Sequence, residues 1–159
     1  MNARSTIPSL ASSWLVGAVP LALLPLCGLL LLACAGNAAP PLSPVRAGLS
    51  CVDDSLDCRN QRQAALEALL ADRSRSWVRQ PADASAYASG VRLFAFKKRK
   101  RELDCVELGI GEREANAARP TLRAASNRLT PAQIARGAML GDEVGRELAR
   151  EHRRRGCKA

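Results

Sequence analysis

The apolar positions of the chain divide it into an apolar leader and a longer region in which apolar side chains are spaced. Residues 15–32 are almost wholly apolar and end in four consecutive leucines. From residue 51 onward, apolar side chains recur at intervals of three and four, which is the period of one face of an α-helix. The pattern predicts a small all-α fold of four helices after the leader.

The first two predicted helices lie between residues 55 and 101. One begins near Ser55 or Asp57 and continues towards Ser74, with an apolar face of Leu66, Leu69, Leu70 and Trp77. The other starts after Pro81 with Asp83 as its N-cap, and its apolar positions are Tyr87, Val91 and Phe94. A strand is the alternative for residues 91–96, because their composition favours β-structure and Gly90 disfavours a helix.

Capping signals mark the starts of the last two predicted helices. Asp104 and Glu107 have the spacing of a capping box, and this helix carries Val106, Ile110 and Ala117 and ends at Arg119, before Pro120. Thr130, Pro131 and Gln133 start the fourth helix, whose inner stripe is Ile134, Ala138, Val144 and Leu148. Glycines recur there at positions 137, 141 and 145, which permits a close helix contact within the domain or, alternatively, between two copies.

Four short-connected helices favour an up-down-up-down bundle. That topology places the start of the first and third helices and the end of the second and fourth at one end of the bundle. Four cysteines lie at those positions: Cys51, Cys58, Cys105 and Cys157. We expect two disulfides, with Cys51–Cys157 and Cys58–Cys105 preferred among the three connectivities. Structural zinc is the alternative, but its ligands are usually spaced two to four residues apart.

The leader has the layout of a secretory signal. Arg4 precedes the apolar run, and small residues follow it. The alternative is a retained transmembrane helix, because about 20 apolar residues span a bilayer. Pro20 and Pro25 would interrupt such a helix. The sequence therefore predicts an exported chain, in a compartment that keeps disulfides oxidised.

The end of the leader, Leu31-Leu32-Ala33-Cys34, resembles the lipobox of bacterial lipoproteins. The resemblance implies cleavage before Cys34, a diacylglycerol on the Cys34 sulfur and an acylated new amino terminus. It divides the chain into a signal peptide (1–33), a lipidated cysteine with a Pro-rich tether (34–50) and a disulfide-stabilised helical domain (51–159). Because Ala35 is not Asp, the outer membrane is the expected destination. Alternatively, Ala33-Cys34-Ala35 suits the ordinary signal peptidase, which would release a soluble periplasmic or secreted protein.

The chain carries 24 basic and 15 acidic side chains, a formal charge of +9. Two basic runs lie at the predicted cysteine end, where the tether also enters: Lys97, Lys98, Arg99, Lys100 and Arg101, and Arg153, Arg154 and Arg155. This end is expected to contact anionic lipid or an acidic envelope polymer, although solvated helix ends explain the same residues. Export and an aromatic content of 3% argue against nucleic acid as the partner.

Signals for catalysis are weak. His152 is the only histidine and lies among charged residues, and Asp53-Asp54 suits the negative charge favoured before a helix. We expect no enzymatic activity, no cofactor and no metal. The predicted function is a structural or interaction lipoprotein of the bacterial envelope, and the alternative is a soluble binding or inhibitor-like module.

Overall fold

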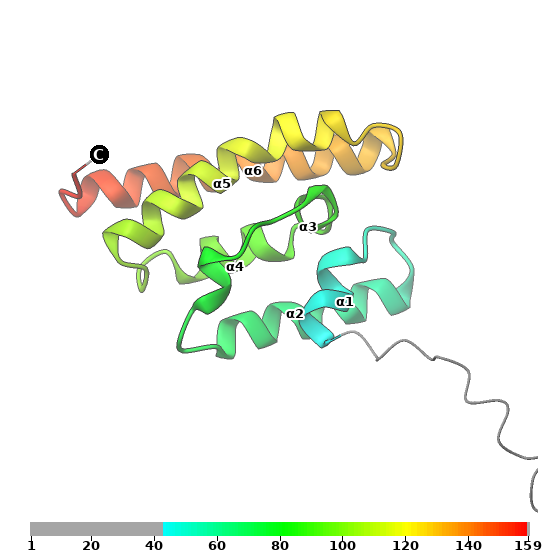
Figure 1. Cartoon of the computed structure of the whole chain (residues 1–159), viewed down its shortest axis with the longest axis horizontal. Helices are drawn as coiled ribbons and strands as arrows, with labels where there is room; N and C mark the ends of the chain where they lie inside the picture. Colours follow the sequence, from blue (N-terminus) through cyan, green and yellow to red (C-terminus); the bar gives the residue numbers. More distant parts are fainter. Residues whose placement is uncertain (1–42, 159) are drawn as a thin grey trace, which may run out of the picture. The chain divides into compact units, whose positions relative to one another are not determined.

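A computed structural model describes residues 43–158 (Figure 1). The predicted signal peptide and Cys34 lie outside the described residues. Within them the fold is all-helical, without strands, and its elements are α1 Pro44–Ser50, α2 Leu56–Ala71, the 3₁₀-helix η1 Ser76–Arg79, α3 Ala84–Ser89, α4 Val91–Arg99, α5 Cys105–Ala124 and α6 Pro131–Arg154. None of the helices in this range is long and apolar enough to cross a membrane.

The predicted helix starts are confirmed by their caps. The side chains of Ser55, Asp83, Asp104 and Thr130 accept a hydrogen bond from the backbone two or three residues into α2, α3, α5 and α6. The last two helices have the complete capping box, because Glu107 and Gln133 also accept from the backbone N–H of the cap residue. Local sequence therefore determines where these helices begin.

The segment predicted as the end of the tether is helical. Ser43 caps α1, and Gly48 lies so close to Gln61 and Ala65 that an added Cβ would collide with α2. Glycine therefore lets α1 pack directly on α2. The predicted tether (34–50) is therefore wrong for residues 44–50, which belong to the helical unit.

The predicted second helix is two helices. Gly90 has a left-handed φ of 76°, which ends α3 and starts α4 in a new direction. Of the apolar positions predicted for this segment, Tyr87 and Val91 are buried, but Phe94 is not. Phe94 is 41% exposed, whereas Phe96 is fully buried against Trp77. The strand alternative for residues 91–96 is wrong.

Helix α5 also differs from its prediction. It continues through Pro120 to Ala124, and Val106, expected on the inner face, is 65% exposed. The buried residues are instead Glu107, Leu108, Gly111, Ala115, Ala118 and Leu122. Pro120 is exposed, so its ring and missing N–H do not disturb the packed face.

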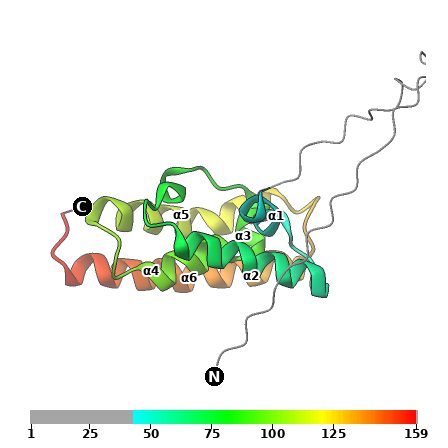
Figure 2. The same cartoon turned by 90° about the horizontal axis from the view of Figure 1, so that it is seen from below.

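The up-down-up-down arrangement is wrong at its first helix. Lys97 in α4 and Lys100, its C-cap, pair with Glu143 and Glu147 of α6 in the same order, so α4 and α6 run in the same direction, which the prediction also required. Arg99, at the end of α4, donates to the carbonyl of Asp72, just after the end of α2. Helix α2 therefore also runs with α4, because the connection through η1 carries the chain back, as Figure 1 and Figure 2 show. Among the four helices α2, α4, α5 and α6, α5 is the one that runs in the opposite direction.

The disulfides are Cys51–Cys58 and Cys105–Cys157, so the preferred pairing was wrong. The two bridges lie at opposite ends of α6. Gln133, in its first turn, donates to the carbonyl of Val52, whereas Cys157 follows its last turn. An α-helix of 24 residues is about 36 Å long, far beyond the Cα–Cα separation of about 7 Å that a disulfide tolerates.

The glycine stripe of α6 packs against its own chain. An ideal Cβ on Gly137 would lie 2.8 Å from Leu122 Cδ1, and one on Gly141 would lie 2.9 Å from the Ala115 carbonyl oxygen. Gly145 likewise faces α5 near Asn116. The interpretation as close packing within the domain is confirmed, and the stripe is not free to contact a second copy.

Replacing Gly141 by Ala is expected to destabilise the fold. The new methyl group would overpack α5, which typically costs about 1–3 kcal/mol and exceeds the gain of up to about 1 kcal/mol in helix propensity. Gly109→Ala is the matched control, because its Cβ would meet only the Arg113 guanidinium at 3.5 Å. Urea unfolding should show Gly109→Ala equal to or more stable than the parent and Gly141→Ala less stable; equal stability of the two variants would contradict the packing.

Candidate functional site

The two basic runs lie near one another, as predicted, but not where the chain enters. The turn after α4 contacts Arg155 at the end of α6. The chain enters at α1, and the adjoining segment is bound at the other end of α6, where Arg136 pairs with Asp54. The expectation that the tether and the basic runs share one end is therefore wrong, because it followed from the incorrect topology.

Much of the basic charge is used inside the fold. Lys97 pairs with Glu143 and Glu147, and Lys100 pairs with Glu147. The Lys100 ammonium holds the pKa of the Glu147 carboxyl below its usual value. Five consecutive charges were expected to stay in solvent, yet two of them bind α4 to α6.

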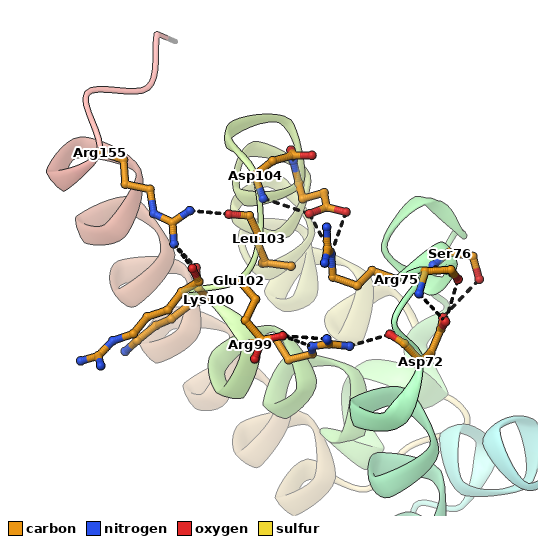
Figure 3. A network of polar contacts seen from close by, with 12 residues as sticks. Asp72, Arg75, Ser76, Arg99, Lys100, Glu102, Leu103, Asp104 and Arg155 are labelled. Carbon is orange, nitrogen blue, oxygen red and sulfur yellow. Dashed lines mark hydrogen bonds and ion pairs between the residues drawn. The ribbon is translucent and has the colours of Figure 1, made fainter.

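A polar clamp, defined here as Arg155, Glu151 and the turn at residues 100–103, joins the end of α6 to the turn after α4; Figure 3 shows the part formed by Arg155 and the turn. The Arg155 guanidinium donates to the carbonyl oxygens of Lys100, Arg101 and Leu103. Glu151 accepts from Arg155 and from Arg154. These contacts satisfy the carbonyls of the turn beside the Cys105–Cys157 disulfide, so they serve the fold.

A second set of contacts in Figure 3 fixes the connection after α2. Arg99 is buried, against the expectation of solvation, and donates to Glu102 and to the carbonyl of Asp72. Arg75 has a left-handed φ of 52° and pairs with the buried carboxylate of Glu107. Arg75 is the one non-glycine residue with a positive φ in the described chain, and its side-chain hydrogen bonds to Glu107 stabilise that backbone conformation.

The clamp predicts an acid-dependent stability. Hydrogen bonds from Arg154, then Arg155, lower the pKa of Glu151 from 4.5 to about 2. Since the carboxylate is favoured in the folded state, its contribution is complete above about pH 4.5 and is lost as the pH falls through about 2. We expect Glu151→Gln to flatten the acid dependence of the unfolding free energy in this window. Glu67→Gln is the control, because Glu67 is an exposed residue of α2. If the unfolding free energy of Glu151→Gln depended on pH as steeply as that of the parent, the prediction would be contradicted.

A buried ion pair joins α4 to α5 inside the core. The side chains of Arg92 and Glu114 are only 3% and 8% exposed. Arg92 also donates to the carbonyls of Val78 and Gln80, and its guanidinium lies over Trp77, 5.6 Å from the ring centroid. Desolvation raises the pKa of Glu114, while the bond from Arg92 opposes that shift. Because both charges are fully engaged with the protein, the pair is a structural element.

Other basic side chains remain exposed and belong to no ion pair within residues 43–158. On and just after α4 they are Lys98 and Arg101, and on α6 they are Arg146, Arg150 and Arg153. We define the α4–α6 face as these five residues with the exposed Phe94 and Met139. Arg153 is the one member of the predicted 153–155 run that is both exposed and unpaired here.

Two hollows lie along the α4–α6 face. One, of about 620 Å³, is strongly charged and is lined by Lys100, Arg101, Glu147, Arg150, Glu151 and Arg154. The other, of about 650 Å³, is more apolar; it is lined by Phe94, Met139 and Leu140 together with two arginines and two carboxylates, Arg136, Arg146, Asp142 and Glu143. The face thus has a basic half and a half in which apolar side chains lie beside arginines and paired carboxylates.

The predicted minor sites have structural roles. The ligand atoms of Cys51, Asp53 and Cys58 lie within 4.8 Å of one another, but the two sulfurs are bonded together and are not free thiolates. Asp53 accepts from the Ser55 N–H before α2, and these bonds lower its pKa. Nδ1 of His152 lies 3.9 Å from a Glu112 oxygen.

The contribution of Phe94 and Met139 to this surface was not predicted. The one signal in the sequence is the spacing of Phe94, Lys98 and Arg101, which repeats at four and three residues and places them on one helical face. No family model, curated protein or solved structure matches the chain, so the functional argument is based on these residues.

Proposed function

We propose that this chain is a bacterial cell-envelope lipoprotein, anchored through Cys34, whose helical unit is a non-enzymatic module that contacts an anionic surface. The observation that carries the proposal is the distribution of charge in residues 43–158. Except for Glu112, every side-chain carboxylate in this range accepts a hydrogen bond or joins an ion pair with a basic residue. The arginines of the α4–α6 face join none of the ion pairs within residues 43–158, although the pKa of the Asp142 carboxyl, lowered mainly by its hydrogen bond from Arg119, is lowered further by the nearby Arg146.

The proposed anchor follows from the lipobox, Leu31-Leu32-Ala33-Cys34. From Cys34, the shortened tether to Ser43 reaches on the order of 28 Å if it is extended, at about 3.1 Å per residue. A diacylglycerol together with an acylated amino terminus would anchor the chain stably by itself, so the basic residues would set how the helical unit lies on the membrane. Lipid and basic surface would thus act together, on the periplasmic side of the outer membrane.

Metabolic labelling with a radioactive fatty acid tests the anchor. We expect the parent to incorporate the label and Cys34→Ala to lose it. Cys27→Ala, seven residues earlier in the leader, is the matched control and should retain incorporation.

An unlabelled parent recovered in the periplasm would instead favour the alternative, a soluble binding or inhibitor-like module released by the ordinary signal peptidase. The sequence Ala33-Cys34-Ala35 is the observation in favour of that alternative. Under either outcome, the helical unit and its basic surface are the same.

A further inference from the structure

We propose that the α4–α6 face lies flat against an anionic bilayer, with its arginines on lipid phosphates and Phe94 and Met139 among the headgroups. This inference deepens the proposed function and rests on it for the presence of a membrane. It replaces the end-on contact predicted from the sequence, because the chain enters at the opposite end from Arg153.

The basic half of the α4–α6 face consists mainly of arginines on one exposed side of α6. Arg146, Arg150 and Arg153 are spaced by four and three residues, so they form one exposed stripe on α6. Arg101 lies across the charged hollow from Arg150. Guanidinium groups bind phosphate oxygens in bidentate fashion, and each basic residue near an anionic leaflet strengthens binding.

The apolar half distinguishes a bilayer from a soluble polyanion. Phe94 is 41% exposed and Met139 is 70% exposed, and both line the hollow that Arg146 also borders. A surface that combines apolar and basic side chains is typical of protein that lies in the membrane interface. A hydrophilic acidic polymer would use the arginines alone and gain nothing from the two apolar side chains.

The course of α6 agrees with a side-on orientation. Gln133 marks the end at which the chain enters, through its hydrogen bond to Val52. At a rise of 1.5 Å per residue, Met139 lies about 9 Å and Arg153 about 30 Å along the helix from that point. A module standing on its entry end would hold Arg153 away from the surface, whereas a module lying on α6 brings both residues to it.

Oxidation of Met139 reports on this contact directly. The chain, purified as the cell produces it, is mixed with vesicles of phosphatidylcholine, with or without phosphatidylglycerol, and treated with dilute peroxide. The rate of sulfoxide formation at Met139 is followed by peptide mass spectrometry. We expect phosphatidylglycerol vesicles to slow the oxidation several-fold and high salt to restore it. Phosphatidylcholine vesicles should give no protection.

Charge-matched variants locate the face. Arg146, Arg150 and Arg153 replaced together by Gln should lower the partition constant onto anionic vesicles on the order of a hundredfold and abolish the protection. The control replaces three exposed arginines on and after α2, namely Arg59, Arg73 and Arg79. It should retain most of the binding and the protection. Circular dichroism checks that both variants fold.

Three results would overturn the inference. They are oxidation of Met139 at an unchanged rate on bound anionic vesicles, equal loss of protection in both triple variants, and equal protection by soluble polyglutamate. Each leaves the lipid anchor standing, because fatty acid labelling tests that separately. If Met139 is protected in a chain that incorporates no fatty acid, membrane contact by the α4–α6 face is supported and lipidation at Cys34 is contradicted.

Discussion

Replacing Arg92 by Met is expected to destabilise the fold by about 3–5 kcal/mol, which is a large part of the stability of a small domain. The substitution keeps an unbranched apolar stem but removes the guanidinium, so the Glu114 carboxylate is left buried without its charged partner. The carbonyls of Val78 and Gln80 lose a donor as well. Urea unfolding of the chain, followed by circular dichroism, measures the loss.

The double variant Arg92→Met with Glu114→Leu separates the ion pair from simple packing. Since it removes both charges, we expect it to lose less than the sum of the single variants, by at least about 1 kcal/mol. Arg119→Met, which breaks an exposed pair with Asp142, is the control and should have a much smaller effect. Additive losses at positions 92 and 114 would show that the pair is not coupled.

Removing the Cys105–Cys157 bridge is expected to cost more than removing Cys51–Cys58. The first closes a loop with a sequence separation of 52 residues and the second one of 7. The loop-entropy relation gives about 4 and about 2.5 kcal/mol, respectively. Paired Cys→Ser variants, unfolded in urea without reductant, measure the difference.

The polar clamp should preserve the native structure of the variant that lacks the Cys105–Cys157 bridge. Arg155 still joins the turn after α4 when the bridge is absent, so the Cys105→Ser, Cys157→Ser variant should keep its native helix content before unfolding. Peptide mapping of the oxidised parent is the accompanying control. Peptides joined through Cys58 and Cys105 would contradict the observed topology.

Local signals in the sequence predicted the starts of α2, α3, α5 and α6, because caps depend on residues three positions apart, but they missed α1 and α4. They did not predict the course of the chain. The turn at Gly90 changes the phase of α4, and the return through η1 makes α2 and α4 parallel. Both depend on how Trp77 and Phe96 pack in the core, which spacing along one helix does not report.

The basic surface could be predicted only in part. Lys98, Arg101 and Arg153 are exposed, as the runs suggested, but Arg99 is buried. Carboxylates such as Glu147 decide which basic side chains remain unpaired. Glu147 is distant from Lys97 and Lys100 in the sequence but pairs with both in the fold. Counting charges in the sequence gives the net positive charge of the chain. The packing of the helices decides which basic side chains are paired and which stay exposed.

The central claim is that the chain reaches the envelope as a lipoprotein, and the mass of its mature amino-terminal peptide tests this most directly. We expect a peptide that begins at Cys34 and carries diacylglycerol on the sulfur and an acyl group on the new amino terminus. A peptide that begins at Gly36 without lipid, or one that retains the leader, would contradict the account.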